Sequence, residues 1–352
     1  MPGPETVYLN GRFLAQPVSG VQRYGREIVR ALDRRPNAAD YMLLTPDDAA
    51  PFDLTSIPIR RLPGSGHIWE QTVLAHAARR GPLLSLGGAG PLLHPRQTVV
   101  IHDAAVFRHP EHFRPGYVRL HRLLGRALAR RARLATVSHF SRAELSAVLG
   151  TPAGAIALAP NGADHFARLT PDLQAPARLG LEGHPFFLAL GNLAPNKNIP
   201  VMIRALDRLA DPEVRLVLVG GQDDKVFCRL HADDPRIIFA GRLDDAAVAG
   251  LLRQARALIF PSLYEGFGIP PLEAFAQGCP VLASNIPAVH EVCAGAALYF
   301  APHDDAALTA LMSASMALPP DPQWRAIARQ RVAAYSWDTS AAVLDALVRT
   351  SR

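Results

Sequence analysis

The chain has 352 residues, which is long enough for two domains that each bury a sizeable core. Its composition of 49% hydrophobic and 19% charged residues is that of a globular protein and excludes a disordered chain. The formal net charge of +6 is unevenly spread, because residues 1–168 hold 21 Arg and Lys against 12 Asp and Glu, whereas the rest hold 16 against 19.

The basic first half does not interleave aromatic with basic residues as nucleic-acid-binding proteins do, so we expect no nucleic-acid partner. An anionic membrane surface or a lipid-linked diphosphate acceptor suits its charge better. The alternative is that the excess of basic residues only reflects a sequence that is rich in arginine throughout. No apolar run reaches about 18 residues and no signal-like segment opens the chain, so we expect neither a spanning helix nor a secretory signal. We therefore predict a cytoplasmic protein, peripheral on the inner face of the membrane.

The three cysteines, Cys228, Cys279 and Cys293, are odd in number and match no metal-ligand spacing. This pattern predicts reduced thiols that are packed in the protein interior.

The chain begins with a strand, a glycine-containing loop and a helix. Residues 7–9 predict the strand, and Ser19 and Gly20 open a helical pattern over residues 21–32. This layout points backbone N–H groups at a phosphate, although Gly20 alone could be an ordinary turn glycine. The absence of Gly-x-Gly-x-x-Gly argues against a nicotinamide dinucleotide.

Strands and helices alternate through the rest of the first half. Further strands are predicted at residues 41–44, 57–59, 83–86, 98–101, 134–137 and 156–159, and helices at 68–78 and 115–133. The strand at 98–101 delivers His102 at its carboxyl end, where ligands bind in open α/β sheets, although a lone histidine is more often structural. One face of the second helix carries four arginines, which is usual for a solvated face: Arg119, Arg122, Arg126 and Arg130.

A domain boundary is predicted near residues 165–182, where helix-breaking residues interrupt any pattern: Pro171, Pro176 and Gly180. We therefore predict an N-terminal domain over residues 1–170 and a C-terminal domain over residues 171–335.

The second half starts with a buried strand at residues 186–190, a loop that contains Asn192 and Lys197, and a helix at 199–209. Lys197 is one of only two lysines, the other being Lys225. The alternation continues with strands at 215–219, 237–240, 257–260 and 281–283, and with helices at 244–255, at 270–277 and beyond residue 304.

The strand at 257–260 leads into a glycine-flanked turn and a helix, with Glu265 before the turn and Glu273 inside the helix. Gly266 and Gly268 allow close approach of the backbone, and the helix N-terminus directs N–H groups at an anion. Two carboxylates beside an anion can accept hydrogen bonds from hydroxyls on either side of it. A diphosphate between two sugars, one of them a ribose, has this layout.

Residues 262–270 read Ser-Leu-Tyr-Glu-Gly-Phe-Gly-Ile-Pro, and with Glu273 they resemble the Glu-x7-Glu signature of the retaining glycosyltransferases of family 4. The resemblance covers nearly the whole chain and is strongest at 186–200 and 257–300. It implies an α/β protein of the GT-B architecture, with two doubly wound Rossmann-like domains that face a cleft. It also implies that a C-terminal helix over residues 336–352 crosses back to the N-terminal domain.

The resemblance implies transfer of a hexose from a nucleotide diphosphate sugar to a lipid-linked or oligosaccharide acceptor in surface polysaccharide synthesis, with retention of configuration. Mannose from GDP-mannose is preferred, ahead of UDP-hexoses and dTDP-rhamnose. The implied catalytic residues are His102 on the acceptor side, Lys197 on the diphosphate and Glu265 on the sugar. The implied donor-binding residues are Gly20, Asn192, Lys197, Arg242, Glu265, Gly266, Phe267, Gly268, Ile269 and Glu273, the last on the ribose.

The sequence departs from the family at one cation. Members usually carry an arginine where this chain has Asn192, and Arg242 is a candidate to lie near the base. No Asp-x-Asp occurs in the chain, so we expect neither a metal nor another cofactor, and protein groups must meet the charge of the leaving diphosphate.

Two other functions remain open. A sugar-nucleotide epimerase has the same architecture and would turn over the donor without an acceptor. A non-catalytic partner subunit would bind a nucleotide without transfer, and the missing arginine at position 192 is compatible with it.

Overall fold

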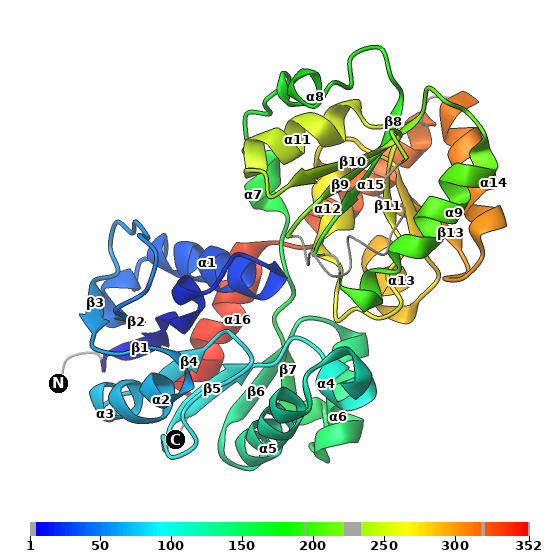
Figure 1. Ribbon diagram of the computed structural model, residues 1–352. Coiled ribbons are helices and arrows are strands. Elements are labelled where there is room, and N and C mark those ends of the chain that lie inside the picture. Colours follow the sequence, from blue (N-terminus) through cyan, green and yellow to red (C-terminus); the bar gives the residue numbers. More distant parts are fainter. Residues whose placement is uncertain (1–4, 193, 222–233, 318–320, 351–352) are drawn as a thin grey trace. The chain divides into compact units, whose positions relative to one another are not determined.

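The computed structural model describes residues 5–192, 194–221, 234–317 and 321–350 (Figure 1). The chain forms two compact units: unit 1 comprises residues 1–161 and 336–352, and unit 2 comprises residues 162–335. The division therefore falls between Asn161 and Gly162, earlier than the predicted boundary after residue 170, and the C-terminal segment belongs to the first unit.

Unit 1 is built on a seven-stranded parallel sheet in the order β3-β2-β1-β4-β5-β6-β7. Its strands are β1 (Val7–Asn10), β2 (Tyr41–Pro46), β3 (Ile59–Leu62), β4 (Leu83–Ser85), β5 (Gln97–Val100), β6 (Arg133–Thr136) and β7 (Ile156–Leu158). Most of these strands are short apolar runs, as expected of a parallel sheet that helices cover on both faces. The strand order reverses between β1 and β4, which is the place where doubly wound sheets bind ligands.

The main helices of unit 1 are α1 (Gly20–Asp33), α2 (Gly66–Trp69), α3 (Ala75–Ala77), α4 (Ala105–Arg108), α5 (Pro115–Arg131), α6 (His139–Leu149) and α16 (Trp337–Arg349). In Figure 1, α1 and α16 lie on one face of the sheet, and α2, α3 and α5 lie on the other. The single helix predicted over residues 68–78 is instead α2 and α3 joined by a π-helical turn, Glu70–Leu74. The strand predicted at 57–59 forms later, as β3.

Helix α16 completes the core of unit 1. Trp337 is buried and packs edge-on against Tyr24 of α1, with ring centroids 5.7 Å apart. The buried carboxylate of Asp345 accepts hydrogen bonds from Tyr41 at the start of β2 and from Asn37 before it. These contacts attach the C-terminal segment to elements near the start of the chain.

Unit 2 is built on a six-stranded parallel sheet in the order β10-β9-β8-β11-β12-β13. Its strands are β8 (Phe186–Leu190), β9 (Arg215–Val219), β10 (Ile237–Gly241), β11 (Ala257–Phe260), β12 (Val281–Ser284) and β13 (Ala297–Phe300). The order reverses between β8 and β11, so ligands are expected beyond the carboxyl ends of these two strands.

The helices of unit 2 are α7 (Asp164–Ala167), α8 (Ala175–Arg178), α9 (Ile199–Leu209), α11 (Asp245–Gln254), α12 (Ile269–Ala276), α13 (Pro287–Cys293), α14 (Asp305–Ala317) and α15 (Pro322–Ala333). In Figure 1, α9 and α14 cover one face of the sheet, and α11 and α12 cover the other. The prediction of two doubly wound α/β domains is confirmed.

Two of the three cysteines lie within the described residues. Cys279 and Cys293 are free and buried, as predicted, and burial raises the pKa of each thiol to about 12. Both are therefore unreactive at neutral pH. Cys228 and Lys225 lie outside the described residues. Within the described part of the chain, no helix combines the length and the apolar character that a membrane span needs.

Candidate functional site

The glycine-rich turn of unit 2 joins β11 to α12. Gly268 is the residue before the helix and has a φ of 97°, a left-handed conformation that favours glycine. The second and third helical residues, Pro270 and Pro271, have no N–H group. The backbone N–H donors at this end of α12 therefore come mainly from Gly266 to Ile269, and the two prolines hold the chain in helical geometry.

Lys197 and Glu265 meet beside this turn. Lys197 ends a short 3-10 helix, Pro195–Lys197, that follows β8, and its Nζ forms an ion pair with Oε1 of Glu265. The two side chains are 23% and 15% exposed, so both can be reached from solvent. The Lys197 ammonium also lies 5.3 Å from the centre of the Phe260 ring. Gly191 makes room for this lysine, since a Cβ there would come within 3.3 Å of Lys197 Cε.

Asparagines connect the Lys197 loop with the glycine-rich turn. The backbone carbonyl of Asn196 accepts a 2.8 Å hydrogen bond from Leu263, and its side-chain amide donates to Tyr264. Asn198 has a φ of 49°, and its amide donates to the carbonyls of Pro261 and Pro302. Sequence reasoning missed both asparagines. The available signal was that Asn is tolerated in the left-handed region better than most residues.

Asn192 and Arg242 lie close together around Gly221. A Cβ on Gly221 would be 2.9 Å from an Arg242 guanidinium nitrogen and 3.2 Å from Asn192 Oδ1. An arginine therefore lies near Asn192, the residue that stands where the resemblance leads one to expect an arginine. A recess at the same edge of the sheet is lined by residues that include Gly191, Asn192, Lys197, Phe260 and Ser262.

Glu273 lies inside α12 and is almost completely buried. Its Oε1 is 3.3 Å from Nε2 of His165, which belongs to the short helix α7, and the two side chains are 8% and 9% exposed. Sequence reasoning predicted Glu273 as a ligand residue but missed His165, whose place beside α12 is set by the path of the chain between the two sheets.

Phe267 and Ile269 have buried side chains. Phe267 is 4% exposed and packs edge-on against Tyr335, with ring centroids 5.2 Å apart, and Ile269 is 7% exposed. If these two residues contact a ligand, they therefore do so through backbone atoms.

Gly20 and His102 belong to unit 1. Gly20 is the first residue of α1, and His102 follows β5. The Nε2 of His102 donates a 2.9 Å hydrogen bond to the carbonyl of Leu86, and its ring lies edge-on to Tyr24, with centroids 4.8 Å apart. Burial lowers the pKa of His102 to about 4, so the imidazole is neutral at pH 7.

One group of side chains among the described residues has the composition of a metal site. The ligand atoms of His109, Glu111 and His112 all lie within 4.8 Å of one another in unit 1. The Glu111 side chain is 61% exposed, and His109 already contacts it at 3.2 Å. This group lies apart in sequence from every predicted site residue except His102.

A family model described as "Glycosyl transferases group 1" matches residues 174–331. Over 260 residues the chain is 32% identical to O-antigen chain mannosyltransferase B of Escherichia coli, covering 69% of this chain and 67% of that protein. It is 30% identical over 222 residues to O-antigen chain mannosyltransferase RfbU of Salmonella typhimurium, covering 61% of this chain and 59% of the relative.

Solved structures similar to this chain cover almost its whole length. Sucrose-phosphate synthase from Thermosynechococcus elongatus superposes with a TM-score of 0.74 at 21% identity, covering 98% of both chains. Alr3699/HepE from Anabaena, in complex with UDP and glucose, gives 0.75 at 17% identity, covering 98% of this chain and all of the other. WaaG, a glycosyltransferase involved in lipopolysaccharide biosynthesis, gives 0.75 at 17% identity and covers 97% of this chain and 99% of that one. At such low identity these similarities show the fold alone, and they confirm the predicted GT-B class.

Proposed function

We propose, since the chain belongs to the group 1 glycosyltransferases, that it transfers a hexose from a nucleotide diphosphate sugar to a lipid-linked or saccharide acceptor, with retention of configuration. Mannose is the preferred sugar and GDP-mannose the preferred donor, because relatives at 30% identity or more are named mannosyltransferases of O-antigen chains. In this proposal the transfer is a step in the synthesis of a surface polysaccharide.

The observation that carries this proposal is the ion pair between Lys197 and Glu265 beside the glycine-rich turn. Each side chain holds the other at the carboxyl ends of β8 and β11, where the strand order reverses. A donor diphosphate would compete with Glu265 for the Lys197 ammonium. Glu265 would then accept hydrogen bonds from hydroxyls of the donor sugar and stabilise positive charge that develops at the reacting carbon.

The remaining donor contacts are assigned as follows. The N–H groups of Gly266 to Ile269 would share the diphosphate charge with Lys197. Arg242 would supply the cation that Asn192 does not, since both side chains lie close to Gly221. Glu273, whose carboxylate His165 approaches, would bind the ribose hydroxyls.

In this proposal the acceptor attacks on the face from which the diphosphate leaves, and the leaving phosphate takes the acceptor proton. His102 would contact the sugar as a neutral imidazole, because its pKa is near 4. No step requires a metal or another cofactor, since Lys197, Arg242 and the backbone N–H groups supply positive charge.

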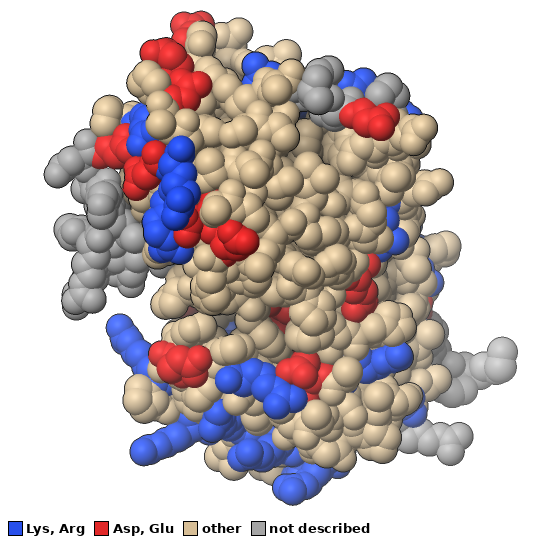
Figure 2. All heavy atoms as spheres, turned by 90° about the vertical axis from the view of Figure 1, so that its right-hand side faces the viewer, with Lys and Arg blue, Asp and Glu red and all other residues tan. Residues whose placement is uncertain are grey.

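We also propose that the protein is cytoplasmic and binds the inner face of the membrane through unit 1. Unit 1 holds 22 Arg and Lys against 13 Asp and Glu, a net charge of +9, whereas unit 2 holds 15 against 18. Figure 2 shows Lys and Arg gathered over the lower part of one face, the level at which Figure 1 places α4, α5 and α6. An anionic lipid surface attracts such a cluster.

A thermal-shift screen of nucleotides and nucleotide sugars, followed by transfer assays with the binding donor, tests the proposal. We expect GDP and GDP-mannose to stabilise the protein most, and the sugar to reach a saccharide acceptor. Donor turnover that needs no acceptor would instead identify an epimerase. Tight nucleotide binding without any transfer would identify a non-catalytic subunit.

A further inference from the structure

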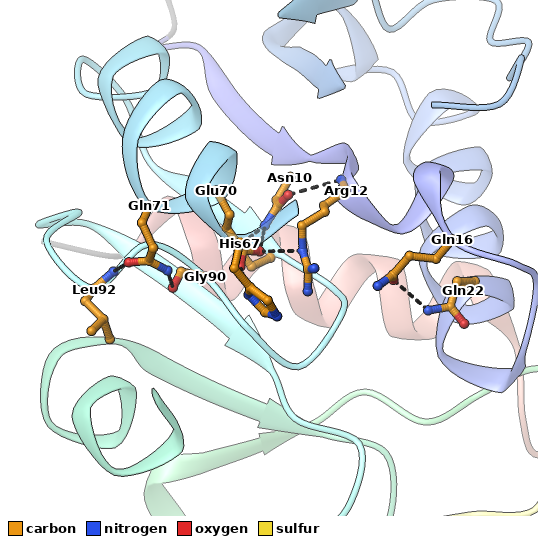
Figure 3. A network of polar contacts seen from close by, with 10 residues as sticks. Asn10, Arg12, Gln16, Gln22, His67, Glu70, Gln71, Gly90 and Leu92 are labelled. Atoms are coloured by element: carbon orange, nitrogen blue, oxygen red, sulfur yellow. Dashed lines mark hydrogen bonds and ion pairs between the residues drawn. The ribbon is translucent and has the colours of Figure 1, made fainter. Parts of the chain in front are cut away.

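A second cluster of polar side chains lies at the carboxyl ends of β1 and β4 in unit 1 and takes no part in the chemistry above (Figure 3). It is centred on Glu70, in the π-helical turn between α2 and α3, a type of turn that is frequent at functional sites. The other members come from β1, from the segments that follow it and from α2 and α5: Asn10, Arg12, His67, Tyr117 and His121.

Glu70 is a buried, ionised carboxylate. It is 1% exposed and accepts hydrogen bonds from Asn10 at 2.7 Å and from Arg12 Nε at 3.2 Å. Burial alone would raise the pKa of Glu70, but the hydrogen bonds from His67 and Asn10 and the charge of Arg12 lower it on balance. The negative charge of Glu70 therefore offsets the positive charge of Arg12, and the pair has no net charge.

The cluster keeps unused hydrogen-bonding groups. Among the described residues, Arg12 bonds only through its backbone N–H and Nε, so its two terminal amino groups are left as donors. Oε2 of Glu70 lies 3.2 Å from Nδ1 of His67, and a carboxylate there requires the proton on Nδ1. In the neutral ring Nε2 of His67 is then an acceptor, and this side chain is 33% exposed.

Aromatic rings form one wall of the cluster. Tyr117 stacks on His121 with centroids 4.0 Å apart and on Phe113 at 5.6 Å, and Tyr117 is 45% exposed. Burial lowers the pKa of His121 to about 4, so this ring is neutral at pH 7.

We propose that this cluster binds a neutral sugar residue of the acceptor, an inference that rests on the proposed function and specifies its acceptor. Sugar hydroxyls both donate and accept hydrogen bonds, which matches the Arg12 donors and the His67 acceptor, and a sugar ring can lie against Tyr117. The Arg12–Glu70 pair offers a phosphate no net positive charge, and a phosphate would have to approach the Glu70 carboxylate. The site therefore selects the saccharide end of an acceptor and not its phosphate.

Saturation-transfer NMR with methyl α-mannopyranoside and methyl α-glucopyranoside as probes tests this proposal. Tyr117→Ala, at a side chain that is nearly half exposed, should weaken binding of one of these probes about three- to tenfold. Arg12→Gln combined with Glu70→Gln, which removes both charges together, should weaken it about tenfold or more. Arg80→Gln, at an exposed arginine of the same unit outside the cluster, is the matched control and should bind as wild type does.

Three outcomes would overturn the proposal. The first is probe binding that neither cluster variant changes. The second is inorganic phosphate that displaces the probe. The third is a signal that disappears in Glu265→Gln and persists in the cluster variants, because the probe would then occupy the donor site. A thermal shift with nucleotide sugars measures donor binding in the same proteins and is a separate readout. If the wild-type protein binds no donor, the proposed function is contradicted, whereas the sugar site in unit 1 is not.

Discussion

Lys197 and Glu265 hold each other at the ends of two neighbouring strands, β8 and β11, so the charge that would meet a diphosphate is already in position. We expect Lys197→Ala to lower kcat about a hundred- to a thousandfold, the usual cost of losing one preorganised electrostatic contact. Lys197→Arg should retain only part of the wild-type kcat, because a guanidinium needs a planar fork of acceptors. Steady-state transfer rates measure both, with Arg204→Ala, at a half-exposed arginine that pairs with Asp305, as the control.

The neighbouring Asn192 gives a second variant for the same assay. Asn192→Arg should partly rescue Lys197→Ala, if positions 192 and 197 face the same phosphates. A Lys197→Ala enzyme within about fivefold of the wild-type kcat would show instead that other groups, Arg242 first among them, carry the charge.

Glu273 provides a test of nucleotide binding. Removing a charged acceptor of two ribose hydrogen bonds costs about 1.5–3 kcal/mol, so Glu273→Ala should bind GDP or UDP about ten- to a hundredfold more weakly. Calorimetric titration measures the affinity, and circular dichroism checks that the fold survives, since this side chain is buried. Glu182→Ala, at an exposed glutamate of the same unit, should bind as wild type does. Unchanged affinity in a folded Glu273→Ala protein would remove the ribose assignment.

At the scale of the elements, the loops after β8 and β9 touch backbone to backbone. A Cβ on Gly220 would be 1.8 Å from the carbonyl oxygen of Gly191, so Gly220→Ala must displace one of the two loops. We expect a loss of about 1–3 kcal/mol in the free energy of unfolding, the range for an overpacked site, and a weaker donor affinity because Gly191 and Asn192 move. Urea titration measures the first. Gly295→Ala, where a Cβ would meet open space, should be near neutral, and equal effects of the two substitutions would refute the argument.

Helix α16 gives a second prediction at this scale. Trp337 is 1% exposed and packs against Tyr24. Trp337→Ala should therefore destabilise unit 1 by about 3–5 kcal/mol. Hydrogen exchange read by mass spectrometry should show the loss in β1 and α1, both in unit 1. Trp324→Ala, whose indole donates to Ala296 within unit 2, should loosen unit 2 instead. Loss of protection confined to α16 would mean that the helix is a dispensable appendage.

For the whole molecule, the charge difference between the units predicts salt-dependent membrane binding. Vesicles that contain anionic lipid should pellet the protein at low salt, and less of it as ionic strength rises. Of the four arginines on the predicted basic face, Arg122 donates to backbone carbonyls of unit 1, whereas Arg130 is exposed. Arg130→Glu should therefore reduce pelleting with little change in stability. Equal pelleting with neutral and anionic vesicles would contradict the membrane proposal.

The fold was predictable because local signals and the final structure agree in most places. Buried parallel strands appear as apolar runs, and His102 was predicted from its place after one of them. The roles of Lys197 and Glu265 were predicted from the resemblance to a known family, and all three stay predictions. The π-helical turn at Glu70 was not predictable, since it depends on partners such as Asn10 and Ser85, which come from distant strands. The burial of the Phe267 ring against Tyr335 and the contact of His165 with Glu273 were not foreseen for the same reason, since long-range packing decides both.

Unit 1 is made of two stretches separated by the whole of unit 2, and this has a consequence for synthesis on the ribosome. Unit 2 is continuous, so it can collapse as soon as its own residues have left the exit tunnel. The first 161 residues, although made earlier, cannot complete their core before α16 is made. Trp337 of this helix packs against Tyr24, and its Asp345 accepts hydrogen bonds from Tyr41 and Asn37. Although most of unit 1 is translated first, we therefore expect it to finish folding after unit 2, once α16 has left the exit tunnel.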